Sequence, residues 1–422
     1  MERAILVGAP TKDVPARVAD EHLAELGRLA DTAGAEVASV VRQRLDSPHP
    51  RLFIGEGKTE ELRLAVQVSG ADLVIFDEEL SPAQGKGLED AVGVRVMDRS
   101  ELILDIFATR ARSREARMQV ELAQLEYLLP RLKRMWSHLS RIRGGIGLRG
   151  PGETQLETDR RLIGKRIKDL KLKLESVAMS RAVQRQSRGG SFRAVLVGYT
   201  NAGKSSLLRA LSGSDLFVED RLFATLDSAT RTVDLGSGYE ALVTDTVGFI
   251  RKLPHHLVAS FRSTLEEARE ADVLLHVVDA SHPDREEQEQ VVQEVLAELD
   301  LTGRPEIRVY NKIDRLTHAE EEALRDRVRA LHQTPAIFVS AVQPKTLDAL
   351  KGTLLMRVRR LFQQVRVDLP VRDGEALAAI YREGEVLKRE DRDTVIELTA
   401  RLPRALLGRL RQREGIRILE VA

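Results

Sequence analysis

The first 110 residues alternate amphipathic stretches with short apolar runs. The stretches "HLAELGRLADTAG" and "KTEELRLAVQVSG" have the apolar period of helices, and each ends in a glycine that suits a helix C-cap. Around them lie runs that predict short buried strands: "RAILVGA", "EVASVV", "RLFIG", "DLVIFD" and "GVRVMD". This alternation predicts a small α/β domain with a largely parallel sheet over residues 1–110.

The pattern changes to a heptad repeat over residues 111–187. Apolar side chains recur with strict 4-3 spacing in two stretches, first at Met118, Leu122, Leu125, Leu129, Leu132, Trp136 and Leu139, then at Ile163, Ile167, Leu170, Leu174 and Val177. This spacing predicts two helices of about 28 residues, packed as an antiparallel hairpin about 40 Å long. Thr154 and Glu157 fit a capping box that opens the second helix.

After the polar linker "QRQSRGGS", strand and helix patterns alternate again. Residues 192–362 predict a second α/β domain, with strands at "FRAVLVG", "EALVTDT", "DVLLHVVDAS", "EIRVYNK" and "PAIFVSA". Residues 363–422 predict a small α+β domain, with helices near 373–382 and 402–412 and strands at "QVRVDLP", "DTVIELTARL" and "IRILEVA".

Charge is distributed unevenly along the chain. Residues 110–188 carry 20 Lys+Arg against 8 Asp+Glu, a net charge of +12, which leaves −11 on the rest of a chain whose total is +1. The basic middle favours either a polyanion-binding segment or a solvated arginine-rich surface, and charge alone does not decide between them. The chain has no cysteine, which fits a cytoplasmic location, and it lacks an apolar run long enough to span a membrane.

One glycine loop has the sequence and the context of a phosphate-binding loop. "GYTNAGKS" follows a predicted strand and precedes the helical "SSLLRALS", so backbone N–H groups and a helix N-terminus can surround phosphate oxygens. Lys204 is expected to reach the β and γ phosphates, and the Ser205 hydroxyl to bind Mg²⁺. The residues predicted to contact nucleotide here are Gly198, Tyr199, Thr200, Asn201, Ala202, Gly203, Lys204 and Ser205.

Three further motifs follow predicted strands in the order of a guanine-nucleotide site. Asp245 can hold Mg²⁺ through water, and the Gly248 N–H can sense the γ-phosphate. The Asp314 carboxylate can accept two hydrogen bonds from guanine, whereas adenine lacks that pair of donors. The predicted contacts are Asp245, Thr246, Val247 and Gly248, then Asn311, Lys312, Ile313 and Asp314, then Ser340, Ala341 and Val342.

Residues 192–362 therefore resemble the GTPase branch of the P-loop NTPases. The resemblance implies that Thr225 binds Mg²⁺ and the γ-phosphate, although Thr230 and Thr232 remain rivals for this role. It assigns the direct part in hydrolysis to Lys204, Thr225 and Gly248. Phe249 stands where many such GTPases have glutamine and cannot orient a water, so we expect slow hydrolysis until a partner or a rearranged switch completes the site.

A second glycine motif, "GGIGLRGPGETQLETDRR", contains the spacing of a dinucleotide loop. Because a basic heptad helix precedes it, rather than a strand, we interpret it as the tip of the hairpin. Its glycines allow close approach to a polyanion, and its arginines can pair with phosphate or stack on bases, which suits structured RNA. The candidate RNA-binding residues are Arg141, Arg143, Gly144, Gly145, Gly147, Arg149, Gly150, Gly152, Arg160 and Arg161.

This glycine motif, with "GYTNAGKS", "FATLD", "DTVGFIRKLPHHLVASFRSTLEE" and "NKID", resembles the HflX family of GTPases over nearly the whole chain. The resemblance adds Phe223, Ala224, Leu226 and Asp227, beside Thr225, to the expected GTP contacts. It implies GTP hydrolysis stimulated by the ribosome, and binding to the large ribosomal subunit near its peptidyl-transferase region. It also implies the splitting of stalled or idle ribosomes under stress.

Two other functions remain open at this point. An ATP- or GTP-dependent factor for rRNA remodelling or ribosome assembly would also use a basic arm, although ATP would need a second site and "GEGK" at residues 55–58 is short for one. A regulatory GTPase with peripheral membrane association is a third class, weakened by the lack of a lipidation motif. We expect a monomer that binds GTP, GDP and Mg²⁺ and does not bind DNA.

Overall fold

The computed structural model describes residues 2–135, 151–186, 191–214, 219, 221–253, 257, 267–331 and 335–420. These residues form two compact units, each described by itself below. The first contains Met1–Arg181 together with two segments from later in the chain, Glu219–Asp227 and Ile250–Leu265. The second contains Ala182–Val218, Ser228–Phe249 and Glu266–Ala422.

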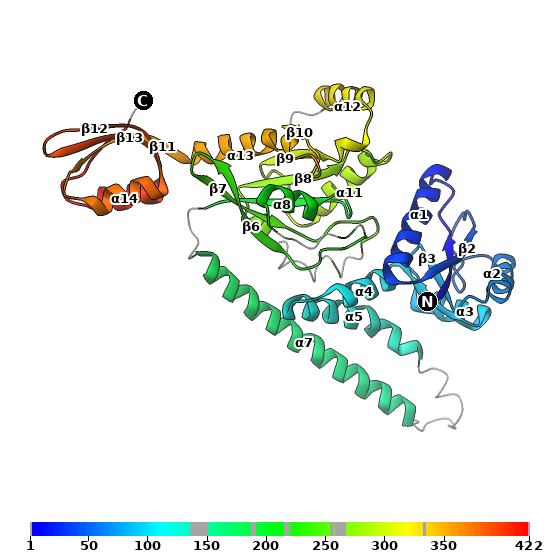
Figure 1. Ribbon diagram of the computed structural model, residues 1–422. Coiled ribbons are helices and arrows are strands. Elements are labelled where there is room, and N and C mark those ends of the chain that lie inside the picture. Colours follow the sequence, from blue (N-terminus) through cyan, green and yellow to red (C-terminus); the bar gives the residue numbers. More distant parts are fainter. Residues whose placement is uncertain are drawn as a thin grey trace. The chain divides into compact units, whose positions relative to one another are not determined.

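The first unit begins with a four-stranded parallel sheet in the order β2-β1-β3-β4 (Figure 1). Helices α1 and α4 pack against each other, as do α2 and α3, and the latter pair covers a core that includes Val74 and Phe76. Gly34 and Gly70 end α1 and α2 with positive φ, as the sequence predicts. The bounds are β1 (Arg3–Gly8), α1 (Ala16–Ala33), β2 (Glu36–Arg42), α2 (Glu56–Ser69), β3 (Leu73–Phe76), α3 (Pro82–Val92), β4 (Arg95–Asp98) and α4 (Arg99–Arg110).

The predicted strand at "RLFIG" is wrong. Residues 49–53 form a tight turn in which His49 and Phe53 exchange backbone hydrogen bonds and Phe53 has a φ of 61°. Phe53 and Ile54 are buried in the domain core, so the apolar run reflects burial within a loop. The sequence pattern also missed α3, which starts at a capping box formed by Ser81 and Gln84.

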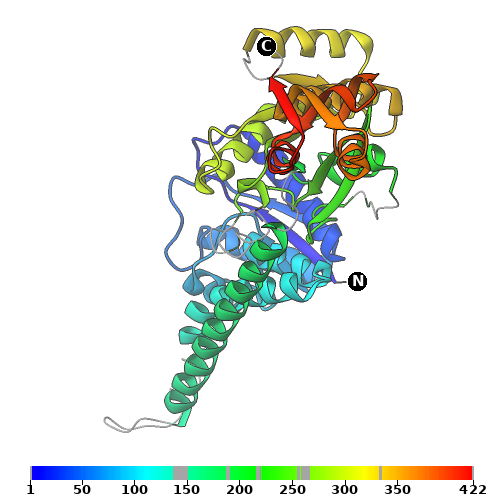
Figure 2. The same cartoon turned by 90° about the vertical axis from the view of Figure 1, so that its left-hand side faces the viewer.

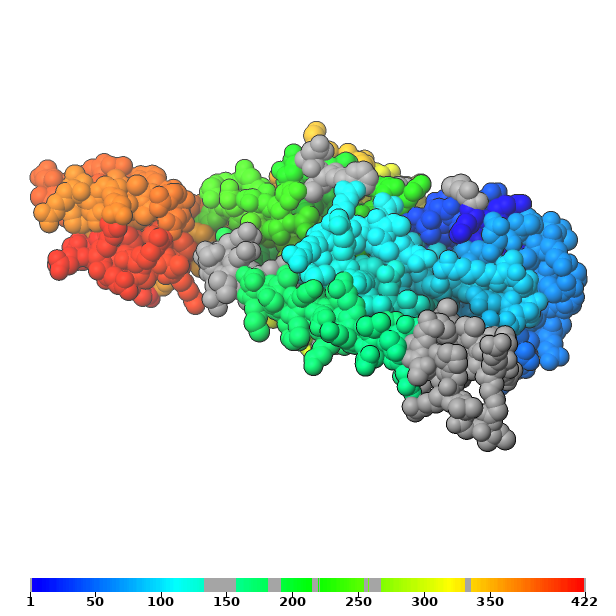
Figure 3. Space-filling model, turned by 90° about the horizontal axis from the view of Figure 1, so that it is seen from below, coloured from blue at the N-terminus to red at the C-terminus, as the bar shows by residue number. Residues whose placement is uncertain are grey.

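A helical hairpin follows in the same unit, as the heptad spacing predicts. Helices α5 (Arg114–Met135) and α7 (Pro151–Gln186) run side by side (Figures 2 and 3). Ion pairs join them between Arg166 and Glu121 at 2.6 Å and between Lys171 and Glu126 at 2.8 Å. The second helix begins at Pro151, three residues before the predicted start at Thr154, because proline is well suited to a first helical turn.

The second unit contains a six-stranded sheet in the order β10-β9-β8-β5-β7-β6, parallel except for β6. Leucines of α8 and α13 pack on one face, and side chains of α12 pack against Val278 and Tyr310. The sequence pattern missed β6. The bounds are β5 (Phe192–Gly198), α8 (Lys204–Ser212), β6 (Ala229–Gly236), β7 (Tyr239–Asp245), β8 (Val273–Asp279), α11 (Arg285–Glu298), β9 (Glu306–Asn311), η1 (Ile313–Arg315), α12 (His318–Leu331), β10 (Ala336–Phe338), η2 (Pro344–Leu347) and α13 (Asp348–Leu361).

The same unit ends in a smaller antiparallel sheet in the order β12-β13-β11-β14, covered on one face by two helices. This is the α+β domain that the sequence predicts, with β12 as an additional edge strand. The bounds are β11 (Phe362–Pro370), α14 (Gly374–Glu383), β12 (Glu385–Asp391), β13 (Val395–Pro403), α15 (Arg404–Arg411) and β14 (Arg417–Glu420).

Candidate GTP-binding site

The phosphate-loop sequence joins the carboxyl end of β5 to the first turn of α8. Lys204 is 6% exposed, and its Nζ donates to the carbonyls of Gly198 at 3.0 Å and Tyr199 at 2.9 Å. Burial lowers the pKa of the Lys204 ammonium to about 8, although the Asp245 carboxylate opposes the shift. An anionic group in the loop would compensate for this burial, because it would stabilise the charged lysine.

Two glycines leave no room for any side chain. Gly203 has a φ of +93°, and a Cβ there would lie 2.3 Å from Asn311 Nδ2. A Cβ on Gly248 would lie 2.6 Å from Thr200 Cα and 3.0 Å from Lys204 Nζ. Gly248 therefore brings its backbone against the phosphate loop, an approach that only glycine allows.

Two oxygen donors meet beside this loop. The Ser205 hydroxyl donates to Asp245 Oδ2 at 2.5 Å, and Asp245 is 2% exposed at the end of β7. The hydroxyl of Thr246 donates to the Leu196 carbonyl at 2.7 Å, which fixes the start of the following segment. A hydroxyl and a carboxylate are ligands that suit Mg²⁺, so this donor set fits the ion that P-loop GTPases generally use.

The two motifs that the sequence predicts to recognise the base meet at the ends of β9 and β10. Asn311 donates to the Ala202 carbonyl at 3.0 Å and accepts from the Ala341 N–H at 3.2 Å. The Ser340 hydroxyl donates to Asp314, and Lys312 donates to the Asn201 carbonyl at 2.8 Å. The motif at residues 311–314 therefore contacts the phosphate loop directly, and the motif at residues 340–342 contacts Asn311 and Asp314, while the Val342 side chain stays 71% exposed.

Sequence reasoning missed two residues that hold these motifs in place. Asp279, the last residue of β8, pairs with Lys312 at 2.8 Å. Thr346 accepts from the Ser340 N–H at 2.8 Å. The signal for Asp279 was available, since it ends an apolar parallel strand whose neighbours carry site residues. Thr346 has no such signal.

The FATLD segment lies in the first unit. Phe223 is 1% exposed and packs edge-on against Phe107, with ring centroids 4.7 Å apart. Asp227 accepts from the backbone N–H groups of Arg112 at 3.0 Å and Ser113 at 3.2 Å. Ala224 and Thr225 are half-buried and Leu226 is buried.

The rival threonines have different surroundings. Thr230 and Thr232 belong to β6, where the Thr230 hydroxyl shares a hydrogen bond of 2.9 Å with Thr244 and Thr232 is exposed. Thr225 precedes that strand, outside any helix or strand. The choice among the three for a magnesium ligand stays a prediction.

Phe249 is buried, with 1% of its surface exposed. Its N–H donates to the Gly198 carbonyl at 3.1 Å, and its carbonyl accepts from the Thr200 N–H at 2.6 Å. The backbone after Gly248 is thereby paired with the phosphate loop, and the aromatic ring has no group that could orient a water.

Most of the predicted RNA-binding tip lies outside the described residues. This applies to Arg141, Arg143, Gly144, Gly145, Gly147, Arg149 and Gly150. Gly152 lies in the first turn of α7, and Arg160 and Arg161 are exposed on the same helix. None of the helices in the described part of the chain is long and apolar enough to cross a membrane.

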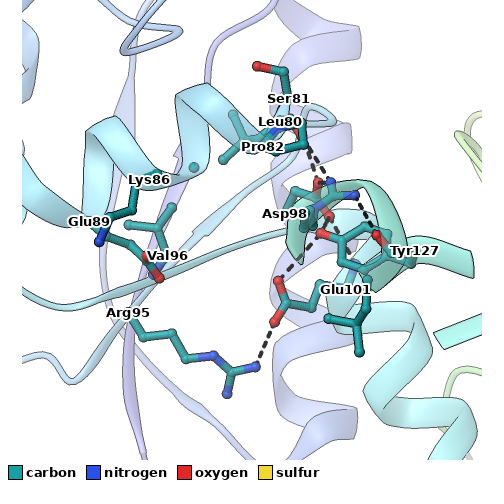
Figure 4. A pocket seen from close by; sticks show the side chains of 13 residues that line it. Leu80, Ser81, Pro82, Lys86, Glu89, Arg95, Val96, Asp98, Glu101 and Tyr127 are labelled. Atoms are coloured by element: carbon teal, nitrogen blue, oxygen red, sulfur yellow. Dashed lines mark hydrogen bonds and ion pairs between the residues drawn. The ribbon is translucent and has the colours of Figure 1, made fainter. Parts of the chain in front are cut away.

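The first unit has a pocket of about 310 Å³ between α3, β4 and α5 (Figure 4). Its polar side chains are bonded to one another: Tyr127 donates to Asp98 at 3.0 Å, and Arg95 pairs with Glu101 at 2.7 Å. The "GEGK" sequence begins α2, where Lys58 pairs with Glu61 at 2.6 Å. The polar side chains named in this pocket, and the lysine of the "GEGK" sequence, are therefore paired with other side chains of the same domain.

The sheet order, the glycine loop and the two motifs that follow β9 and β10 define a P-loop GTPase. Three family descriptions match the chain: "GTP-binding GTPase N-terminal" at residues 20–108, "GTP-binding GTPase Middle Region" at 110–188, and "50S ribosome-binding GTPase" at 193–312. The expectation of a P-loop GTPase fold is confirmed.

Relatives named "GTPase HflX" match most of the chain. The protein of Caldanaerobacter subterraneus subsp. tengcongensis is 50% identical over 368 residues, 87% of this chain and 82% of its own. The Magnetococcus marinus protein is 44% identical and covers 99% and 97%, and that of Escherichia coli K12 is 43% identical and covers 91% and 90%. The chain belongs to the HflX family of GTPases, and its reaction is the hydrolysis of GTP.

A solved structure of a GTP-binding protein from Sulfolobus solfataricus in complex with GDP is similar as well. It is 25% identical, with 86% of this chain and 100% of that chain covered and a TM-score of 0.45.

Proposed function

We propose that this GTPase binds the large ribosomal subunit through rRNA when GTP is bound, and dissociates stalled or idle ribosomes so that their subunits are recycled. One observation carries the proposal: α7, which begins within the glycine-rich motif of the sequence, carries seven exposed cations. They are Arg160, Arg161, Lys165, Arg166, Lys168, Lys171 and Lys173. Helical RNA is recognised mainly through its shape, its phosphates and its 2′-hydroxyls, which a basic arm can contact.

The nucleotide site would control this binding. Lys204 would contact the β and γ phosphates, Ser205 and Thr225 would bind Mg²⁺, and Asp245 would hold the ion through water. The Gly248 N–H would sense the γ-phosphate, and Asp314 would select guanine. The ion would neutralise the charge that develops on the phosphates during hydrolysis.

Four parts of the chain would have separate roles in this function. Residues 1–110 would form the N-terminal domain, 111–187 the RNA-binding arm, 192–362 the GTPase domain and 363–422 the C-terminal domain. The buried Phe249 supports slow hydrolysis by the protein alone, with the ribosome completing the site.

The test is co-sedimentation of the full chain with large ribosomal subunits in a non-hydrolysable GTP analogue, at several salt concentrations. The double variant Arg160→Ala with Arg161→Ala should bind more weakly, and the slope of log affinity against log salt should fall by about 2. The matched control is Arg327→Ala with Arg329→Ala, which removes two exposed cations of α12. Equal weakening by both double variants would refute the role of the arm.

A further inference from the structure

One face of α5 is buried beside the N-terminal α/β domain. Ala116, Val120, Ala123 and Tyr127 recur at the spacing of a single helix face, and each is at most 5% exposed. Helix α5 contacts α3 and α4 of that domain. The alanines allow α5 to approach its neighbours closely. Arg131 continues the same spacing one turn further on, so this face of α5 ends in polar side chains.

One buried carboxylate binds α5 at the polar end of this face. Asp98 is the last residue of β4, and its side chain is 1% exposed. It accepts from the Tyr127 hydroxyl at 3.0 Å and from Arg131 Nη2 at 3.1 Å. It also accepts from the Leu80 N–H at 3.1 Å and from the Glu101 N–H at 2.9 Å, which caps α4. Asp98 therefore joins the end of the sheet to α4, to α5 and to the loop before α3.

The two donors on α5 also hold each other in place. The Arg131 guanidinium carbon lies 3.4 Å from the centroid of the Tyr127 ring. Arg131 donates to the carbonyls of Tyr127 at 3.1 Å and Leu80 at 2.9 Å. Burial, reinforced by Asp98, raises the pKa of the Tyr127 hydroxyl, which therefore stays protonated and remains a donor. Hydrogen bonds to a charged carboxylate are stronger than those between neutral groups.

Helix α5 is weakened at the same place. Pro130 lies inside the helix between Tyr127 and Arg131, and it has no N–H to donate to the carbonyl of Glu126. Because a proline inside a helix bends it, the direction of the helix beyond the proline depends on what fixes that turn. Tyr127 and Arg131 lie on the two sides of Pro130, and both bind Asp98. These bonds therefore restrict the bend.

The cavity of about 310 Å³ between α3, β4 and α5 makes these bonds more important (Figure 4). Tyr127, Leu128 and Arg131 line it from α5. Close packing usually fixes the position of a helix, but here a space separates α5 from part of α3. The hydrogen bonds to Asp98 at the edge of this cavity therefore hold α5 where apolar packing is incomplete.

We propose that Asp98, Tyr127 and Arg131 form an anchor that fixes the direction of the helical hairpin relative to the N-terminal sheet. The three are positioning residues. Since the hairpin carries the exposed cations of α7, the anchor presents them to rRNA in one orientation and reduces the entropy that is lost on binding. This consequence for RNA rests on the proposed function, whereas the anchor itself does not.

The direction of the hairpin can be measured without ribosomes. The chain has no cysteine, so Val68→Cys with Leu162→Cys places one spin label on α2 and one on α7, at side chains that are 90% and 58% exposed. Pulsed electron paramagnetic resonance of the full chain gives the distribution of distances between the labels. Arg131→Ala should broaden this distribution. Arg166→Ala is the control, because it removes an arginine that pairs with Glu121 inside the hairpin, and it should leave the distribution unchanged.

The consequence for RNA is tested with a variant that changes no charge. Tyr127→Phe removes only a hydroxyl and should weaken co-sedimentation with large ribosomal subunits about three- to tenfold. The slope of log affinity against log salt should stay the same, because no cation is lost. The rate of GTP hydrolysis without ribosomes should stay within about twofold of the wild type, as expected for a folded variant. Tyr381→Phe removes a hydroxyl from an exposed tyrosine of α14 and should bind like the wild type.

The two measurements have separate outcomes. Equal distance distributions for Arg131→Ala and Arg166→Ala would overturn the anchor, whether or not the chain binds ribosomes. Wild-type affinity of Tyr127→Phe, or a smaller salt slope in this variant, would overturn the role of the anchor in presenting the cations. If the wild type itself does not co-sediment with large subunits, the proposed function fails, and the distance distributions still decide whether the anchor exists.

Discussion

At the scale of single residues, Glu306 links a buried hydrogen-bond network to pH-dependent stability. His276 is 1% exposed on β8, as expected for a structural histidine, and its Nδ1 lies 3.3 Å from Glu306 Oε1. Burial alone would raise the pKa of Glu306. His276, Gln293 and Arg308 more than offset this effect, and the pKa falls to about 2.

The direction of the pH dependence of stability follows from the lowered pKa of Glu306. Since the unfolded carboxyl titrates near 4.5, its charged form stabilises the folded state fully above that pH and progressively less as pH falls towards 2. Glu306→Gln should therefore lower the free energy of unfolding by about 1–2 kcal/mol at pH 7, allowing for partial solvent screening. Urea unfolding should show the variant and the wild type converging near pH 2. The control Glu322→Gln, at an exposed pair with His318, should show no such convergence.

Site residues could be predicted from the sequence where they lie in a loop that directly follows an apolar strand. The loop from Gly198 to Ser205 and the segments at Asp245 and Asn311 each follow an apolar strand, so their order alone indicates a common edge. Glu25 and Arg251, which lies 3.5 Å from Glu25 Oε2, could not be paired this way, because 226 positions separate them along the chain. Only tertiary structure brings such side chains together.

At the scale of elements, the period of apolar residues predicts helices and central strands better than it predicts the strands at the edges of a sheet. Leu170 of the predicted heptad seam is 1% exposed in α7, whereas Leu172, which lies outside the predicted seam, is 55% exposed. By contrast, β12 reads "EVLKRED", and its charges obscure the strand period. "RLFIG" shows the opposite error, since a buried loop has the composition of a strand.

The different exposure of Leu170 and Leu172 allows a direct test of the packing between α5 and α7. Leu170→Ala should lower the free energy of unfolding by about 2–4 kcal/mol, because it leaves a cavity between the two helices. Leu172→Ala makes the same chemical change on the solvent side of the same helix and should cost less than about 0.5 kcal/mol. Chemical denaturation followed by circular dichroism measures both values. Similar losses for the two variants would show that Leu170 does not lie in a packed seam.

At the scale of the whole molecule, Glu385 joins the two sheets of the second unit. Its carboxylate accepts from Tyr239 of β7 at 2.7 Å, from Arg359 of α13 at 2.8 Å and from Arg401 of β13 at 3.1 Å. The Tyr239 ring packs edge-on against Phe362, the first residue of β11, with centroids 4.9 Å apart. One carboxylate therefore gathers contacts from the GTPase sheet, its last helix and the C-terminal sheet.

Removing this junction should reduce the cooperativity of unfolding more than the stability of either sheet. In Glu385→Ala the two cores remain intact, but Tyr239, Arg359 and Arg401 lose their shared acceptor, so the C-terminal sheet should unfold at a lower temperature than the GTPase sheet. Scanning calorimetry should show a broadened or split transition, with a smaller ratio of van't Hoff to calorimetric enthalpy. Glu383→Ala removes a nearby carboxylate that pairs with Arg382 and Arg409 inside the C-terminal domain, and it should leave the cooperativity unchanged. If both variants give the same transition shape as the wild type, the coupling between the two sheets resides in the apolar contact of Tyr239 with Phe362 and not in the carboxylate.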